Sequence, residues 1–169
     1  MTEISNVGVL EGVRVVELTM WIAGPSAGGL MADWGADVIK VEPEKGDPQR
    51  SIFGALGYGD LPVPGFALDN RGKRSVVLDL QRPEGVVLFN KIVATADVFI
   101  QNFRPGVVER LGIDEPSVRT INPDLIYVSV SGFGDSGPYI DQKSYDYVIQ
   151  ALSGMAAVQA DPATGEPAL

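Results

Sequence analysis

The stretch of residues 13–42 constrains the fold of this chain more than any other feature of its sequence. A β-branched run at residues 13–18 opens it, a second run at Val38, Ile39 and Val41 closes it, and a segment of small residues lies between them. Apolar runs of this kind predict strands that are covered on both faces, as in a parallel sheet packed between helices. The stretch therefore predicts a βαβ unit and an α/β fold.

The rest of the chain continues the same alternation. Strands are expected at residues 76–80, 97–100 and 125–130, with helices at 83–94, from Pro105 onward and at 114–121. Residues 43–70 are rich in proline and glycine and too long for a plain turn, yet their aromatic and aliphatic residues predict an ordered excursion. A length of 169 residues suits a single domain built on an open parallel sheet with flanking helices.

Composition excludes several classes of function. A net charge of −9 argues against nonspecific binding to nucleic acid, which requires a basic surface. No apolar run is long enough to span a membrane, and the N-terminus has no basic region followed by an apolar core, so a cytoplasmic protein is expected. The chain contains neither Cys nor His, which excludes thiolate nucleophiles, Ser-His-Asp triads and Cys or His metal sites within it.

Three predicted strands end in turns with glycine and proline punctuation, the pattern that builds ligand sites at the carboxyl edge of an open sheet. Alternatives stay open at one of these turns and at the basic run that precedes the strand at residues 76–80. The small residues of AGPSAGG after the first strand fit close helix packing better than a phosphate loop, because the full GxGxxG spacing is missing. The basic run Arg71, Lys73 and Arg74 fits a solvated patch or a phosphate-side cluster about equally well.

Six blocks, in order along the chain, make the sequence resemble the class III CoA-transferases of the formyl-CoA transferase and carnitine CoA-transferase type. They are VRVVEL with AGP, LMADWGADVIKVE, NRGKRSVVLDL, NFRPGVVERLGI, INPDLIYVSVSGFGDSGPY and YDYVIQALSGM. The resemblance implies a Rossmann-like α/β fold, of which residues 1–169 form the CoA-binding N-terminal portion of the large domain. A second, smaller domain and a C-terminal return are expected to lie outside this chain.

The resemblance also implies contacts with coenzyme A. Its segments are the turn after the first strand, an adenosine-side segment, a phosphate-side and pantetheine-side wall, and a segment that closes over the cofactor. The implied cofactor-binding residues are Ile22, Ala23, Leu78, Asp79, Leu80, Gln81, Asn102, Phe103, Arg104, Arg110, Lys143, Ser144, Tyr145 and Asp146. Two positions depart from the pattern. Where this chain has Ile22 the best-known transferases have Gln, and where it has Pro43 many members have Arg.

The implied activity is exchange of CoA between an acyl-CoA thioester and a carboxylic acid, through an aspartate nucleophile and without a metal. That aspartate is expected beyond Leu169, so neither Asp146 nor Asp161 is assigned as catalytic and the chain alone is expected to be inactive. An α-methylacyl-CoA racemase is the less favoured alternative, because Tyr145 stands where racemases carry their histidine. The other alternative is a noncatalytic CoA-binding subunit; the expected assembly is a homodimer or a pair with a complementing chain.

Overall fold

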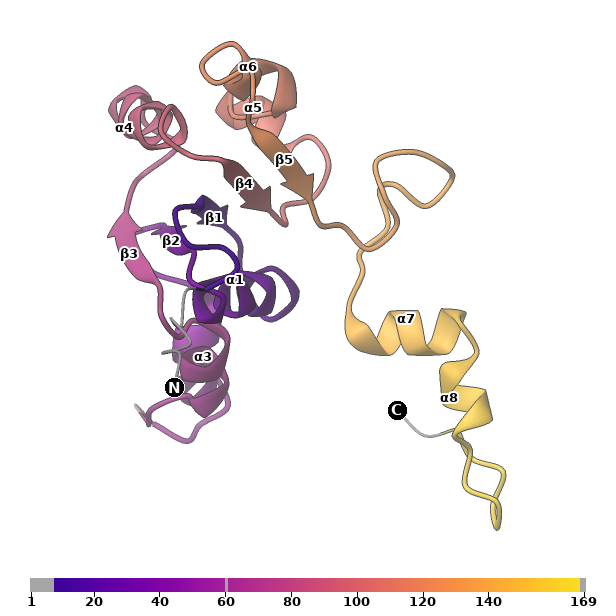
Figure 1. The fold of residues 1–169 in the computed structure, drawn as a ribbon. Helices are drawn as coiled ribbons and strands as arrows, with labels where there is room; N and C mark the ends of the chain where they lie inside the picture. The colour runs from indigo at the N-terminus through magenta and orange to yellow at the C-terminus, as the bar shows by residue number, and fades with distance from the viewer. Residues whose placement is uncertain (1–7, 60, 168–169) are drawn as a thin grey trace, which may run out of the picture. The chain divides into compact units, whose positions relative to one another are not determined.

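The computed structural model describes residues 8–59 and 61–167. These residues form two compact units that divide after Val130. The first unit holds the parallel sheet and the second holds two short helices (Figure 1). Residues 1–7, on which the expectation about a leader partly rests, lie outside the described residues.

The sheet of the first unit has five parallel strands in the order β3-β2-β1-β4-β5. The strands are β1 (Arg14–Leu18), β2 (Asp37–Glu42), β3 (Arg74–Val77), β4 (Val98–Gln101) and β5 (Ile126–Ser129). This arrangement confirms the predicted α/β fold. The predicted strand 76–80 was wrong at both ends, since β3 begins at Arg74 and ends at Val77. It ends early because Asp79 accepts a hydrogen bond from the Gln81 N–H and turns the chain there.

In the first unit, the helices outside the β2–β3 connection are α1 (Ala23–Asp33), α4 (Pro83–Val93), α5 (Val107–Leu111) and α6 (Glu115–Arg119). Pro83 stands in the first turn of α4, where its missing N–H leaves no hydrogen bond unmade. Helix α5 begins at Val107 and not at Pro105 as predicted, because Gly106 precedes it in the left-handed conformation with φ 82°.

The excursion of residues 43–70 is ordered on both sides of position 60, as predicted. It contains the 3₁₀-helix η1 (Pro48–Ser51) and the helices α2 (Ile52–Ala55) and α3 (Pro64–Asp69). The Arg50 guanidinium lies 4.0 Å from the centre of the Phe66 ring, and the buried Asp69 carboxylate accepts hydrogen bonds from Gln49 and from Ser26 of α1. These contacts fix the excursion against the N-terminal half of α1.

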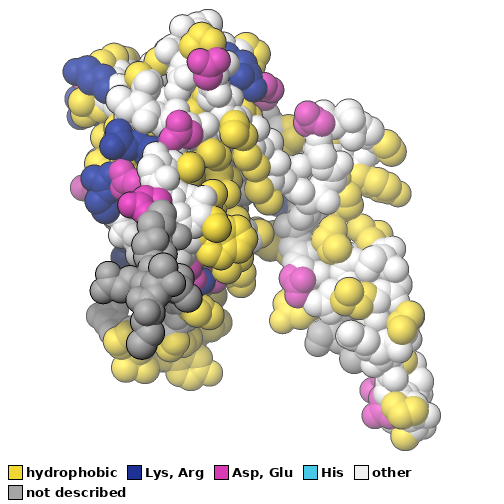
Figure 2. Space-filling model, in the orientation of Figure 1, with side chains coloured by type: hydrophobic (Ala, Val, Ile, Leu, Met, Phe, Trp, Pro, Cys, Tyr) yellow, Lys and Arg dark blue, Asp and Glu magenta, His cyan; other side chains and the backbone are white. Residues whose placement is uncertain are grey.

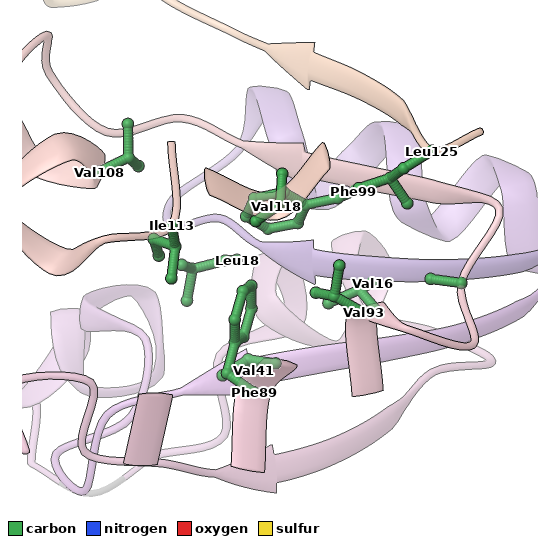
Figure 3. Packing of buried hydrophobic residues seen from close by; sticks show 11 residues of the cluster. Val16, Leu18, Val41, Phe89, Val93, Phe99, Val108, Ile113, Val118 and Leu125 are labelled. Carbon is green, nitrogen blue, oxygen red and sulfur yellow. The ribbon is translucent and has the colours of Figure 1, made fainter. Parts of the chain in front are cut away.

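The two faces of the sheet have different cores. On one face, side chains from β1, β2 and β4 pack against α4, α5 and α6, and Figure 3 shows Phe89 of α4 among Val16, Val41 and Val93. Phe99 meets Phe89 edge to face at 5.2 Å between ring centres. On the other face, Val15, Val38 and Ile100 pack against residues of α1 and the segment before β1. Because side chains alternate along a strand, Glu17 and Lys40 also belong to the α1 face.

The second unit begins with a loop and ends with α7 (Asp146–Leu152) and α8 (Met155–Val158). The ring centres of Phe133 and Tyr139 lie 5.6 Å apart, and Gly132 approaches Ser144 so closely that a Cβ there would lie 2.0 Å from the serine side chain. Large apolar side chains stay exposed on both helices, and Figure 2 shows such yellow areas on the surface. Among the described residues, no helix has both the length and the apolar character that a membrane crossing needs.

Candidate functional site

The order in which the chain adds its strands reverses between β1 and β4, while the strands stay parallel. From β1 the chain builds outward through β2 and β3, and it then returns to build β4 and β5 on the other side. Ligands of open α/β sheets bind outside the carboxyl ends of the strands at this switch point. Here the switch point brings together residues 19–23 after β1 and residues 102–106 after β4, which were predicted from sequence as site-building turns.

The turn after β1 is strained. Trp21 has φ 67°, which among the described residues is the one positive φ outside glycine. This conformation costs a non-glycine residue about 1–2 kcal/mol, and such strain is typical of functional sites. Ile22 follows as the N-cap of α1, and its side chain is 62% exposed. The predicted site residues Ile22 and Ala23 therefore stand at the open carboxyl edge.

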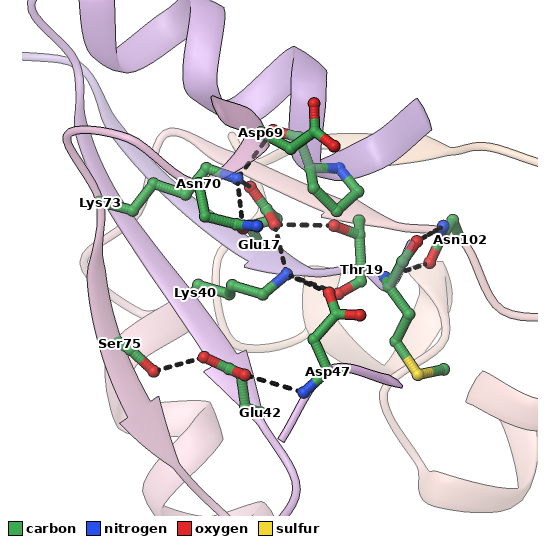
Figure 4. Close-up of polar contacts among 12 residues, drawn as sticks. Glu17, Thr19, Lys40, Glu42, Asp47, Asp69, Asn70, Lys73, Ser75 and Asn102 are labelled. Carbon is green, nitrogen blue, oxygen red and sulfur yellow. Dashed lines mark hydrogen bonds and ion pairs between the residues drawn. The ribbon is translucent and has the colours of Figure 1, made fainter. Parts of the chain in front are cut away.

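Asn102 joins the two turns at the switch point. Its Oδ1 accepts the Met20 N–H at 2.9 Å and its Nδ2 donates to the Met20 carbonyl at 2.7 Å (Figure 4). Phe103 beside it is half-buried and packs against the apolar core. Both residues thus have an internal structural role, and their contact with a ligand stays a prediction.

Arg104 and Arg110 are the cations of this edge. Both are exposed, and neither forms an ion pair with any residue between positions 8 and 167 that the structure describes. The Arg110 guanidinium lies near Gly106, where a Cβ would come within 3.3 Å of its Nη1. Arg110 is therefore held next to the turn that contains Asn102, with its charge available to an anion.

The other predicted contact segments lie in different environments. Leu78 and Leu80 are half-buried against the core at the carboxyl end of β3, while Asp79 and Gln81 are exposed in the turn that follows. Lys143, Ser144, Tyr145 and Asp146 belong to the second unit, at the start of α7, where Asp146 accepts a hydrogen bond from Gln150 at 2.6 Å. The structure thus brings residues 22–23 together with residues 102–110 in the first unit, whereas residues 143–146 belong to the second unit.

The basic run at residues 71–74 is paired within the chain. Arg71 binds Asp33 of α1, and Arg74 binds Asp37 of β2 at 2.6 Å. The Lys73 ammonium is almost fully buried, 2.7 Å from Glu17 and 2.7 Å from the Pro25 carbonyl. Burial lowers the pKa of Lys73, and attraction to Glu17 opposes that shift. Arg71 and Arg74 therefore lie in ion pairs at the surface, whereas Lys73 belongs to the interior.

Beneath α1 lies a buried ionic network that the sequence analysis missed (Figure 4). Glu17 and Lys40 are partners in the register of β1 and β2, and their charged atoms are 3.1 Å apart. The Lys40 ammonium also contacts Asp47 at 3.0 Å, and all three side chains are at most 1% exposed. Gly28 of α1 covers this network, since a Cβ at that position would lie 1.9 Å from the Glu17 carboxylate.

Glu42 extends the network to the surface and predicts a specific acid sensitivity. Burial raises its pKa, but hydrogen bonds from Arg50, Ser75 and the Asp47 N–H outweigh burial and lower the pKa to about 2. Because the folded pKa is depressed from 4.5, its contribution is complete above pH 4.5 and is lost as the pH falls toward 2. The difference in free energy of unfolding between wild type and Glu42→Gln should shrink by roughly 3 kcal/mol over that interval.

Urea unfolding at a series of pH values measures this difference. The control is Glu44→Gln, which removes an exposed carboxylate from the same loop. A wild-type advantage over Glu42→Gln that stays constant from pH 5 to the acid limit would contradict the assignment.

Comparison with known proteins places this geometry in a family. The family model for CoA-transferase family III matches residues 10–169. The chain is 46% identical over 164 residues to a succinate–glutarate CoA-transferase of Agrobacterium fabrum. The matched stretch covers 94% of this chain and 40% of that protein. The chain is 38% identical over 154 residues to the alpha subunit of a succinyl-CoA–L-malate CoA-transferase of Chloroflexus aurantiacus, over 90% of this chain and 36% of the relative.

A solved structure agrees with this match. A CAIB/BAIF family protein from Brucella suis superposes with a TM-score of 0.87 and 40% identity, over 95% of this chain and 43% of that one. The chain thus spans about two-fifths of the length of the relatives that it matches. By its family model, its relatives and its fold, the chain belongs to CoA-transferase family III.

Proposed function

We propose that this chain supplies the CoA-binding part of an enzyme that exchanges CoA between an acyl-CoA thioester and a carboxylic acid. The observation that carries the proposal is the open carboxyl edge at the β1–β4 switch point, where the turn at Trp21 is fixed to Asn102. Beside it stand Arg104 and Arg110, both exposed and without an ion-pair partner among the described residues. CoA presents phosphates, and an acidic chain binds them only through such local cations.

The names of the relatives support small carboxylic acids as the acceptors of CoA. Transferases for succinate, glutarate and malate point to small carboxylic acids as substrates of the complete enzyme. We assign neither Asp146 nor Asp161 as the nucleophile: Asp146 accepts a hydrogen bond from Gln150, Asp161 accepts the Ala163 N–H, and both are exposed. No three His, Cys, Asp or Glu of residues 8–59 and 61–167 are grouped to hold a metal ion, and the proposal needs none.

We also propose that the chain works together with a second one, either another copy or a complementing subunit. Leu152, Met155 and Val158 of α7 and α8 are about half exposed or more, which is the character of an interface and not of a monomer surface. The Chloroflexus relative is itself named as an alpha subunit. The work of the complete enzyme is expected in the cytoplasm.

Arg110→Ala should weaken CoA binding by about tenfold or more, because a charge-assisted contact to phosphate is worth roughly 1.5–3 kcal/mol. Isothermal titration of the purified protein with CoA measures the change. Arg119→Ala is the matched control: Arg119 is an exposed arginine on the next helix, and its guanidinium is paired with Glu115 at 2.8 Å. Equal CoA affinity of the Arg110 and Arg119 variants would contradict the proposed site.

A further inference from the structure

The turn between β1 and α1 is fixed by side chains from three other parts of the first unit. Lys40 of β2 donates to the Thr19 carbonyl at 2.9 Å, and Asn102 binds both backbone groups of Met20. The Asp47 carboxylate accepts the Trp21 N–H at 3.2 Å. Three consecutive residues are therefore held through their backbones, next to the first residues of α1.

Packing does not explain the strained conformation of Trp21. Its side chain is 43% exposed, so the indole is not locked into a core pocket. An unfavourable φ persists only where surrounding contacts over-determine it. The described contact made by the Trp21 backbone amide is the hydrogen bond to Asp47, and this makes Asp47 the residue that acts on the strain directly.

Asp47 is itself rigidly held. Its Oδ1 accepts a second N–H, from Gln49 at 3.0 Å, and its Oδ2 lies 3.0 Å from the Lys40 ammonium. Its own N–H donates to Glu42 at 2.9 Å, and its side chain is fully buried. A buried carboxylate with a cation on one oxygen and two donors on the other has little freedom to reorient.

We infer that Asp47 is a positioning residue for the acyl-CoA site, which holds Trp21 in the left-handed conformation so that Ile22, Ala23 and the start of α1 face the ligand. The inference rests on the proposed function, and it adds a residue that does not touch the ligand. The simpler role for Asp47 is the N-cap of η1, which its bond to Gln49 already serves. The two roles can be tested separately because they use different donors: the Gln49 N–H serves the cap, and the Trp21 N–H serves the turn.

The variant Asp47→Ser separates them. Serine is a good N-cap and can still accept the Gln49 N–H, but its side chain is too short to reach Trp21 as well. Asp97→Ala is the control, since it removes a carboxylate that accepts the backbone N–H of Arg14 at the start of β1, the end of that strand opposite the turn. In a Trp34→Phe background Trp21 is the one tryptophan of the 169 residues, and its quenching by acrylamide reports the order of the turn.

Asp47→Ser is expected to raise the quenching of Trp21 and to weaken CoA binding about tenfold, whereas Asp97→Ala should leave both near wild type. Asp47→Asn keeps an acceptor for both N–H groups and should restore low quenching. Equal quenching in Asp47→Ser and Asp97→Ala would overturn the inference, as would quenching of Asp47→Asn above that of Asp97→Ala. If quenching separates the variants but wild type binds no CoA, the proposed function fails while Asp47 still orders the turn.

Discussion

Replacing Gly28 by alanine is expected to destabilise the first unit by about 4 kcal/mol or more, a large part of the stability of a typical domain. The added Cβ would lie 1.9 Å from Glu17 Oε2 and 3.1 Å from the Lys73 Cε. Neither neighbour can move away cheaply, because the Glu17 carboxylate is held by Lys40, Lys73 and the Thr19 hydroxyl. Urea unfolding followed by circular dichroism measures the loss.

Gly54→Ala is the matched control. Gly54 lies in α2, and the nearest atom to its added Cβ is the Gly59 carbonyl oxygen at 3.8 Å, an ordinary contact. Alanine there should be neutral or stabilise by up to about 1 kcal/mol, since it reduces the freedom of the unfolded chain. A Gly28→Ala protein that unfolds at the same urea concentration as Gly54→Ala would show that the buried carboxylate yields to the extra methyl group.

The fold was predictable because its signals are local. Apolar runs marked the strands within a few residues, and the small residues of AGPSAGG were correctly interpreted as close packing: Gly24 lies over Thr19, and Gly28 lies over Glu17. The errors occurred where one residue turns the chain. Asp79 ends β3 early and Gly106 delays α5, and neither effect has a periodic signal.

The ionic network was not predictable from the same patterns. Glu17 and Lys40 stand among apolar residues of two strands whose pairing the sequence does not give, so it does not show that they share a register position. The available signal was Gly28, because a glycine lets helix α1 approach β1 closely enough to cover the Glu17 carboxylate. The partners of Arg71 and Arg74 were also missed, because Asp33 and Asp37 lie far from them in the sequence and meet them only in the folded chain.

The candidate site was predicted in its position more than in its chemistry. Ile22, Ala23 and Asn102 do stand at the switch point, because strand ends of one direction gather at one edge. The use of the Asn102 amide on Met20, and the left-handed Trp21, depend on tertiary hydrogen bonds that no sequence spacing encodes. Arg104 and Arg110 remain the residues whose role a ligand experiment decides.

Lys40→Met is expected to lower the free energy of unfolding by about 3–5 kcal/mol, the cost of leaving a buried partner charge uncompensated. The ammonium has three partners within 3.1 Å: Glu17 Oε1, Asp47 Oδ2 and the Thr19 carbonyl. Methionine keeps most of the volume of the lysine stem, so the loss reports charge and hydrogen bonding and not a cavity. Glu17 retains Lys73, but Asp47 has no other cation in contact among the described residues.

The matched control for this loss is Arg82→Met, which removes a cation from an exposed pair. Arg82 and Glu84 are 3.6 Å apart with side chains 70% and 74% exposed, so water already screens their attraction and the change should stay below about 0.5 kcal/mol. Equilibrium urea unfolding of both variants at pH 7 compares them. If the two losses are equal, the charges beneath α1 contribute no more than surface charges do. A large difference would instead identify the network as the structure that holds β1, β2 and the turn at Trp21 together.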